Sequence, residues 1–330
     1  MRVMEALTLS RLRPIGCAVL FAALLSHAAP PSFAERVQLI PHFRAGQILF
    51  YRIDFSSALN AKTQSRVTSP QLPPTSNANA SGLLQVEIAE ATSSSLRLKT
   101  FYSERDSSAA PSQSQETPQT QNRAASPDRV VEVSIAADGS ASRISGLDQL
   151  SSAQQFAWRD WLSTFASSMT YPKSGINTGQ KWQTFEPETS PSPIAELSWA
   201  KQYQYVRDEP CRFADAEPKS GSGKPPSPPQ PCAVIFVIST LRQKSSRKNA
   251  TPEDYKLRNL KTRGTVAGHN ETILYVSRST GLLVRSIEDA QQTMDALIAL
   301  EDGSNEVRYS VDAKSHSDIS LLSGSPQSIR

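Results

Sequence analysis

The chain has 330 residues, of which 38% are hydrophobic and only 7% aromatic, and it contains 23 prolines. Three cationic residues and one anionic residue lie in segment 1–34, so the rest of the chain carries 32 cationic and 30 anionic residues. This near-neutral balance excludes a protein that binds nucleic acid through its overall charge.

Segment 1–34 is predicted to be a secretory signal peptide. It has a cationic start, an apolar run over 15–25 that is too short to anchor the chain in a bilayer, and the small-residue pattern Ser-Phe-Ala ending at Ala34. Cleavage after Ala29 is an alternative. Cys17 lies at the start of the apolar run, which disfavours a lipoprotein. We therefore expect an exported protein, periplasmic or extracellular, without a transmembrane helix after signal removal.

The first predicted β unit covers residues 35–146. Segment 47–55 places an apolar side chain at every second position, which is typical of a strand with one buried face; these residues are Leu49, Tyr51, Ile53 and Phe55. Segments 83–89, 96–102 and 129–136 alternate in the same way. Asp138-Gly139 follows the last of them and is a strong hairpin signal.

Segment 147–172 is predicted to be an amphipathic connecting helix. Its apolar residues recur with a helical period; they are Trp158, Trp161, Leu162, Phe165 and Met169. Ser151 and Gln154 fit a capping box, and Pro172 prevents continuation of the helix. The two tryptophans could offer a platform for a sugar, but packing against a sheet is the favoured interpretation.

The second predicted β unit covers residues 173–330. Segment 196–206 alternates, with Trp199 among its apolar residues, whereas segment 232–239 is almost wholly apolar and indicates a central strand. Segments 265–276, 282–290, 293–300 and 306–315 complete a meander. The predicted fold class is therefore mainly β, with antiparallel meanders in two β units joined by one helix.

Cys211 and Cys232 are predicted to form a disulfide bond in an oxidising compartment. They bracket a stretch rich in Pro, Gly and Ser that cannot hold a sheet. The bond is expected to join two adjacent antiparallel strands. Three other polar tracts, 56–81, 103–128 and 242–264, are predicted to be exposed hairpin loops.

A Gly-Gln phrase occurs twice, at Gly46-Gln47 and at Gly179-Gln180, each time before an aromatic residue and an alternating segment. We expect each glycine to make a tight entry into a strand series. Three further motifs are Asp138-Gly139, Trp182 and the Ser-Thr-Gly-Leu-Leu string at 279–283. Together with the two Gly-Gln phrases, they occur in an order that resembles that of an uncharacterised family of exported bacterial β-rich proteins, which carry a domain of unknown function. The resemblance implies export and a β architecture, and it supplies no catalytic residues.

No catalytic, cofactor or metal motif is found. HExxH, CxxC, GxSxG and Walker glycine loops are lacking, and the S-x-x-K string at 245–248 lies in a basic, Ser-rich stretch where it is attributed to chance. Glu288 and Asp289 are adjacent, so on a strand they point to opposite faces and cannot act together. His269 is the best single polar-site candidate, although a turn or edge position is the favoured interpretation for it.

The basic stretch from Arg242 to Arg263 could contact an anionic surface, but a solvated loop is favoured. Three hypotheses for function remain. The first is a non-catalytic protein that binds or scaffolds an envelope component. The second is a carrier of a lipid or another apolar ligand, which the tryptophans Trp158, Trp161, Trp182 and Trp199 would face. The third is a hydrolase that uses His269 and a distant carboxylate.

Overall fold

The computed structural model describes residues 36–65, 75–104, 129–188, 190, 192–214 and 230–323. The predicted signal peptide, most of the polar tract 103–128 and most of the segment between the two cysteines lie outside these residues. Residues 36–330 form one compact unit.

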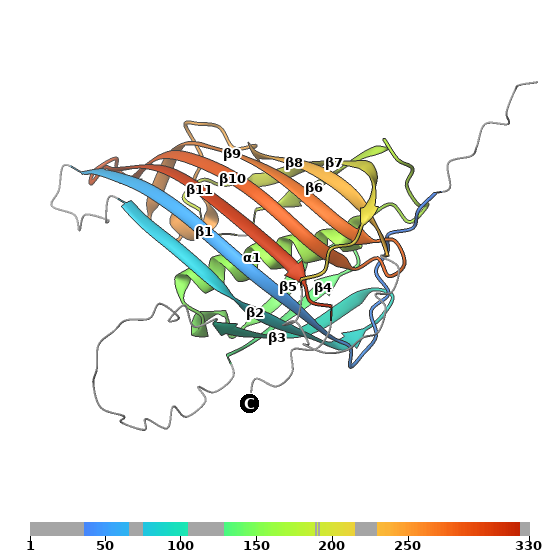
Figure 1. The fold of residues 1–330 in the computed structure, drawn as a ribbon. Coiled ribbons are helices and arrows are strands. Elements are labelled where there is room, and N and C mark those ends of the chain that lie inside the picture. Colours follow the sequence, from blue (N-terminus) through green and yellow to red (C-terminus); the bar gives the residue numbers. More distant parts are fainter. Residues whose placement is uncertain are drawn as a thin grey trace, which may run out of the picture. The chain divides into compact units, whose positions relative to one another are not determined.

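In the described residues eleven strands form a single antiparallel sheet, which confirms the predicted mainly β fold class (Figure 1). The spatial order is β5-β4-β3-β2-β1-β11-β10-β9-β8-β7-β6, so β1 and β11 join the two predicted β units into one sheet. The strands are β1 (Ile48–Ser65), β2 (Thr75–Ala91), β3 (Ser95–Glu104), β4 (Val130–Ala136), β5 (Ala141–Ser145), β6 (Lys181–Pro187), β7 (Leu197–Pro210), β8 (Pro231–Gln243), β9 (Leu260–Ser277), β10 (Leu283–Leu300) and β11 (Val307–Leu321).

Helix α1 (Ser152–Ser167) lies on the concave side of this sheet, which curves around it (Figure 1). The predicted capping box is present: the Ser151 hydroxyl accepts from the backbone N–H of Gln154, and the Gln154 side chain accepts from the backbone N–H of Ser151. The described ranges also contain three short helices: η1 (Leu147–Gln149), η2 (Ser168–Thr170) and α2 (Glu253–Lys256).

The apolar stripe of α1 fills one end of the concave side. Trp158 and Trp161 are fully buried, and the rings of Trp161 and Phe165 lie 5.0 Å apart. Tyr51 of β1 packs against both Trp161 and Phe165. The indole N–H of Trp158 donates to the Thr100 hydroxyl of β3 at 2.8 Å, so its one polar atom is satisfied in the core. This end of the sheet is therefore closed by side chains.

The first Gly-Gln phrase forms a tight turn at the start of β1. Gly46 has a φ of 79°, which glycine adopts without steric cost. Its N–H donates to the carbonyl of Ile88 on β2, and the Gln47 side chain accepts from the backbone N–H of Arg44 at 3.1 Å. The turn thus ties the entry of β1 to the neighbouring strand.

The second phrase repeats this turn at the start of β6. Gly179 has a φ of 83°, its N–H donates to the carbonyl of Tyr205 on β7, and the Gln180 side chain accepts from the backbone N–H of Asn177 at 3.1 Å. In both places the neighbouring strand carries a register shift just beyond the contact. The prediction that each phrase opens a strand series is confirmed.

Three expectations about loops were wrong. Most of 56–81 is strand, because β1 and β2 run far past the apolar alternation and pair through their polar ends. The tract 242–264 contains the end of β8, the helix α2 and the start of β9. Segments 282–290 and 293–300 form the single strand β10. Backbone hydrogen bonds to a neighbouring strand keep these polar residues in the sheet, although their side chains have a low strand propensity.

The disulfide bond between Cys211 and Cys232 is present. It lies where β7 ends and β8 begins, beside the cross-strand pair of Pro210 and Pro231. The prediction that it joins adjacent antiparallel strands is confirmed. No helix in the described part of the chain is both long and apolar enough to cross a membrane.

Candidate functional site

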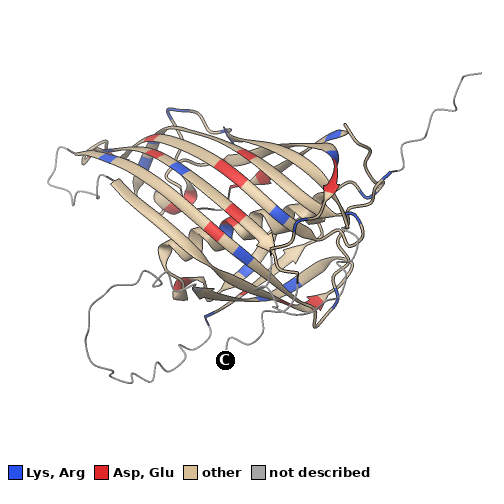
Figure 2. Ribbon diagram, viewed as in Figure 1, with Lys and Arg blue, Asp and Glu red and all other residues tan. Residues whose placement is uncertain are grey.

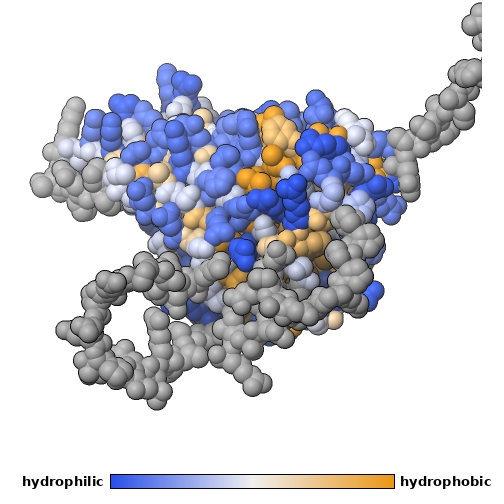
Figure 3. Space-filling model, viewed as in Figure 1, coloured by the Kyte–Doolittle hydropathy of each residue, from blue (hydrophilic) through white to orange (hydrophobic). Residues whose placement is uncertain are grey.

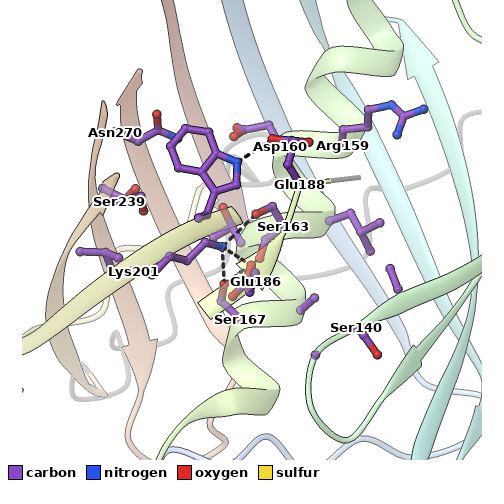
Figure 4. Close-up of a pocket in the computed structure, with 18 of the residues that line it drawn as sticks. Ser140, Arg159, Asp160, Ser163, Ser167, Glu186, Glu188, Lys201, Ser239 and Asn270 are labelled. Atoms are coloured by element: carbon purple, nitrogen blue, oxygen red, sulfur yellow. Dashed lines mark hydrogen bonds and ion pairs between the residues drawn. The ribbon is translucent and has the colours of Figure 1, made fainter. Parts of the chain in front are cut away.

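A cavity of about 620 Å³ lies between α1 and the inner faces of β7 to β10 (Figure 4). The turn between β4 and β5 and the edge strand β6 also line it. Because β5 and β6 are the two ends of the sheet, the cavity is bordered by both sheet edges. Its size is within the range of small-molecule sites in proteins.

Asp160 of α1 and Glu288 of β10 form a pair of acidic side chains in this cavity. Burial, followed by the charge of Glu288, raises the pKa of Asp160 well above its usual range, although Ser317 and Lys201 act in the opposite direction. The Oδ2 atom of Asp160 is buried and makes no hydrogen bond of good geometry with the described residues, and the hydroxyl of the neighbouring Ser317 is buried without one as well. Burial and a neighbouring carboxylate both favour the protonated form of a carboxyl group over the charged form.

Glu288 is held in place by neutral groups. Its carboxylate accepts from the Asn270 side-chain amide at 3.1 Å and from the Thr272 hydroxyl at 2.8 Å, both on the adjacent strand β9. Thr272 is directly opposite Glu288 in the register, so the pairing of β9 with β10 sets this contact. No Lys or Arg in the described ranges makes a salt bridge with Glu288 or Asp160 within 4 Å.

Lys201 of β7 is the buried cation of the site. Its ammonium lies 2.7 Å from the Glu186 carboxylate on the edge strand β6, and it donates to the hydroxyls of Ser163 and Ser167 on α1 (Figure 4). Burial lowers the pKa of Lys201, but Tyr203 and Glu186 outweigh that effect and raise it. Lys201 therefore stays charged and holds the edge strand against the helix.

Trp199 of β7 is the partly exposed aromatic side chain of the cavity. Its indole N–H donates to the Glu188 carboxylate at 2.6 Å. The ring lies over Gly268 of β9, where an added Cβ would come within 2.8 Å of it. Only a glycine at this position leaves room for the indole on the sheet surface.

The charge of the cavity wall is unbalanced. Arg159 and Lys201 are its cations, and it has five acidic residues: Asp138, Asp160, Glu186, Glu188 and Glu288. Glu186 is paired with Lys201, whereas the carboxylate of Asp138 at the mouth accepts from the backbone N–H and hydroxyl of Ser140. The inner wall can therefore bind polar or cationic groups but offers little to an anion.

Sequence reasoning missed Asp160 and Glu288, although it placed Glu288 and Asp289 correctly on opposite faces of a strand. The missed signal was polar side chains at inward-facing positions: Asn270 and Thr272 share a face with buried Leu274, and Glu288 shares one with buried Ser286. Inward polar residues on adjacent strands indicate a polar cavity.

The four tryptophans occupy different environments. Trp158 and Trp161 belong to the filled core. Trp182 of β6 is partly buried and stacks on Tyr203, with ring centroids 5.1 Å apart. Trp199 is the one of the four that lines the cavity.

His269 lies on the opposite, outer face of the sheet. It is on β9 between β8 and β10, so the expectation of a turn or edge position was wrong. Its Nε2 atom is 3.3 Å from the Glu271 carboxylate, and His316 Nδ1 is 2.8 Å from Asp289 across β10 and β11. Figures 2 and 3 show this side of the molecule with charges of both signs and a mainly hydrophilic surface. In the described residues no three His, Cys, Asp or Glu are arranged to hold a metal ion.

The basic stretch is partly neutralised by ion pairs. Lys256 pairs with Glu253 within α2, Lys261 with Glu301, and Arg263 with Glu306. Arg242 lies over the exposed ring of Phe185 at 5.8 Å. Contact of this stretch with an anionic surface stays a prediction.

No known family model matches the chain, and no curated protein is similar to it. Among solved structures, the outer membrane protein OprG from Pseudomonas aeruginosa aligns with 84% of this chain and 96% of its own, at 7% identity and a TM-score of 0.18. The attachment invasion locus protein Ail of Yersinia pestis, solved with the heparin analogue sucrose octasulfate, aligns over 82% and 98% of the two chains, at 6% identity and a TM-score of 0.10. Scores this low do not establish a shared fold.

Proposed function

We propose that this chain is an exported, non-catalytic binding protein that holds a small polar ligand in the cavity between α1 and the sheet. The observation that carries the proposal is the cavity itself, whose wall combines partly exposed Trp199 with the polar side chains of Asp160, Lys201, Asn270 and Glu288. A concave site with an aromatic surface and a few convergent polar groups is typical of small-molecule binding sites.

Export is supported by the disulfide bond and by the predicted signal peptide. Disulfide bonds persist in oxidising compartments and are rare in the cytosol. Cys211 and Cys232 join strand ends with no role in the cavity wall, which favours a structural bond over a redox-active one. A periplasmic or extracellular protein that binds an envelope component agrees with these features.

The alternative of a lipid carrier finds less support in the packing. The apolar part of the concave side is filled by Trp158, Trp161, Phe165 and Tyr51, which leave no described space for an acyl chain there. The remaining cavity exposes carboxylates and an ammonium group, which an alkyl chain would desolvate without compensation. A polar ligand avoids this cost.

The proposal is tested by blocking the cavity. Ser163 is an exposed residue of α1 on the cavity wall, so Ser163→Trp should fill the space at the cost of one hydrogen bond from Lys201, which keeps Glu186 and Ser167 as partners. Ser93→Trp in the exposed turn between β2 and β3 is the matched control. Native mass spectrometry of protein purified from its own host should show a small bound mass that leaves on denaturation, present in the wild type and the control and lost in Ser163→Trp. A bare chain in the wild type, or a mass that survives Ser163→Trp, contradicts the proposal.

A further inference from the structure

We propose that the ligand of the cavity carries an organic cation, a protonated amine or a quaternary ammonium group, which is held by Asp160 and Glu288. This inference rests on the proposed function, since it names the class of ligand for the same site. The juxtaposition behind it is a pair of interacting carboxyl groups, Asp160 on the helix and Glu288 on the sheet, which line one cavity; Figure 4 shows Asp160 on this wall.

Among the described residues no cation forms a salt bridge with Asp160 or Glu288, although Lys201 lies close enough to act on both electrostatically. The buried Oδ2 of Asp160 makes no hydrogen bond of good geometry with the described residues, and Glu288 accepts from the neutral groups of Asn270 and Thr272. The nearest buried ammonium, that of Lys201, is already paired with Glu186 at 2.7 Å. A charged group brought into the cavity would supply the missing partner.

The surroundings of Asp160 also favour a bound proton over a free carboxylate. Burial and the charge of Glu288 raise the pKa of Asp160, so its carboxyl group binds a proton more readily than an exposed aspartate does. A ligand cation beside Asp160 favours its ionised carboxylate over the protonated form and displaces a proton to solvent. Binding should therefore release a proton, and the affinity should rise with pH. The other charged groups that face the pair from the surrounding elements are Arg159 of α1, Glu186 and Glu188 of β6, and Lys201 of β7.

Aromatic side chains line the same cavity as the acidic pair. Trp199 donates its indole N–H to Glu188, which fixes the ring, and Tyr203 lines the same cavity. The face of an indole attracts a cation that lies over it, and organic ammonium ions are commonly bound by aromatic faces together with carboxylates. An inorganic cation would gain little from such a wall, so the observations favour an organic one.

The test compares three probes that differ in one group: 4-phenylbutylammonium, 4-phenylbutanol and 4-phenylbutyrate. Isothermal titration of the full mature chain at pH 7.5 should show the ammonium binding about tenfold or more tighter than the alcohol, because a hydrogen bond to a charged group is worth roughly one such factor. Repeating the titration in two buffers of different ionisation enthalpy measures the proton released. The affinity for the ammonium should increase from pH 5 to pH 8, over which the probe stays charged.

Two variants assign the effect to the pair. Asp160→Asn preserves the shape of the protonated acid and should remove both the preference for the ammonium probe and the proton release. Glu288→Gln should weaken ammonium binding by a similar factor and provides a second measurement should Asp160→Asn fold poorly. Glu271→Gln is the matched control, because Glu271 lies exposed on the outer face of the sheet. It should bind all three probes like the wild type.

The outcomes separate this inference from the proposed function. Equal or tighter binding of the alcohol or the carboxylate overturns the cation while leaving a binding cavity. If no probe binds but the native protein releases a mass that Ser163→Trp abolishes, the ligand class is wrong and the proposed function stands. If neither probes nor a native mass are bound, both fall.

Discussion

Folding buries Asp160, although an aspartate side chain favours a charged and solvated state. An aspartate is ordinarily charged at neutral pH, yet here burial and the neighbouring Glu288 penalise the charge and raise the pKa. A carboxyl group whose pKa is raised on folding adds stability at pH values below its unfolded pKa of about 3.9. That contribution is lost as the pH rises through the folded pKa. A site that costs stability at neutral pH is typical of function.

Asp160→Asn should therefore stabilise the ligand-free protein at pH 8, because the amide never acquires the buried charge. At pH 4 the variant and the wild type should have nearly equal free energies of unfolding, measured by urea denaturation at each pH. Asp295→Asn is the control of opposite sign, since a hydrogen bond from Arg308 lowers the pKa of Asp295. That variant should lose stability at pH 8 and lose less at pH 3. A pH-independent difference for Asp160→Asn would contradict a raised pKa.

At the scale of elements, the two Gly-Gln turns have the same structure, one at the start of β1 and the other at the start of β6. Each starts a strand with a glycine at positive φ and closes on a glutamine side chain, and each donates to the next strand along the chain. No atom lies within 4 Å of a Cβ built at Gly46 or Gly179. The cost of a side chain there is the backbone conformation alone.

Gly46→Ala and Gly179→Ala should each lower the free energy of unfolding by about 1 kcal/mol, the usual cost of a left-handed conformation for an L-residue. Gly281→Ala should cost more, because its Cβ would come within 2.5 Å of the Ile40 carbonyl oxygen. Chemical denaturation of the three variants provides the comparison. A larger loss at Gly46 or Gly179 than at Gly281 would show that the turns contribute more than their local geometry.

At the scale of the whole molecule, one sheet carries both halves of the chain. The first and last strands pair along most of their length, so the two predicted β units share a core and are expected to unfold together. The disulfide bond lies where β7 ends and β8 begins, and Ala214, three residues after Cys211, donates its N–H to the carbonyl of Leu321 at the end of β11. The bond closes a loop with a sequence separation of 21 residues.

Replacing both cysteines by alanine should lower the free energy of unfolding by about 3 kcal/mol, as expected for a loop of this length. The dependence of that free energy on urea should steepen, because the unfolded chain without the bond exposes more surface. Wild-type protein treated with reductant should behave like the double variant. An unchanged urea midpoint in the variant would show that the bond adds no stability.

The sequence by itself determined the strands, the helix and the disulfide bond, because alternation, helical period, capping and turn residues act over a few neighbouring positions. It identified the buried face of β1, the stripe of α1 and both Gly-Gln turns. It did not reveal that β1 and β2 extend into the polar tract 56–81, since pairing with a neighbouring strand decides such ends.

Only the tertiary structure decided the candidate site. Asp160 and Glu288 are 128 positions apart and each is unremarkable among its sequence neighbours. The curvature of the sheet brings β10 under α1, and the register of β9 with β10 places Thr272 beside Glu288. Burial, which raises the pKa of Asp160, exists only when helix and sheet have packed. The chemistry of this cavity is therefore a property of long-range contacts, which no local pattern specifies.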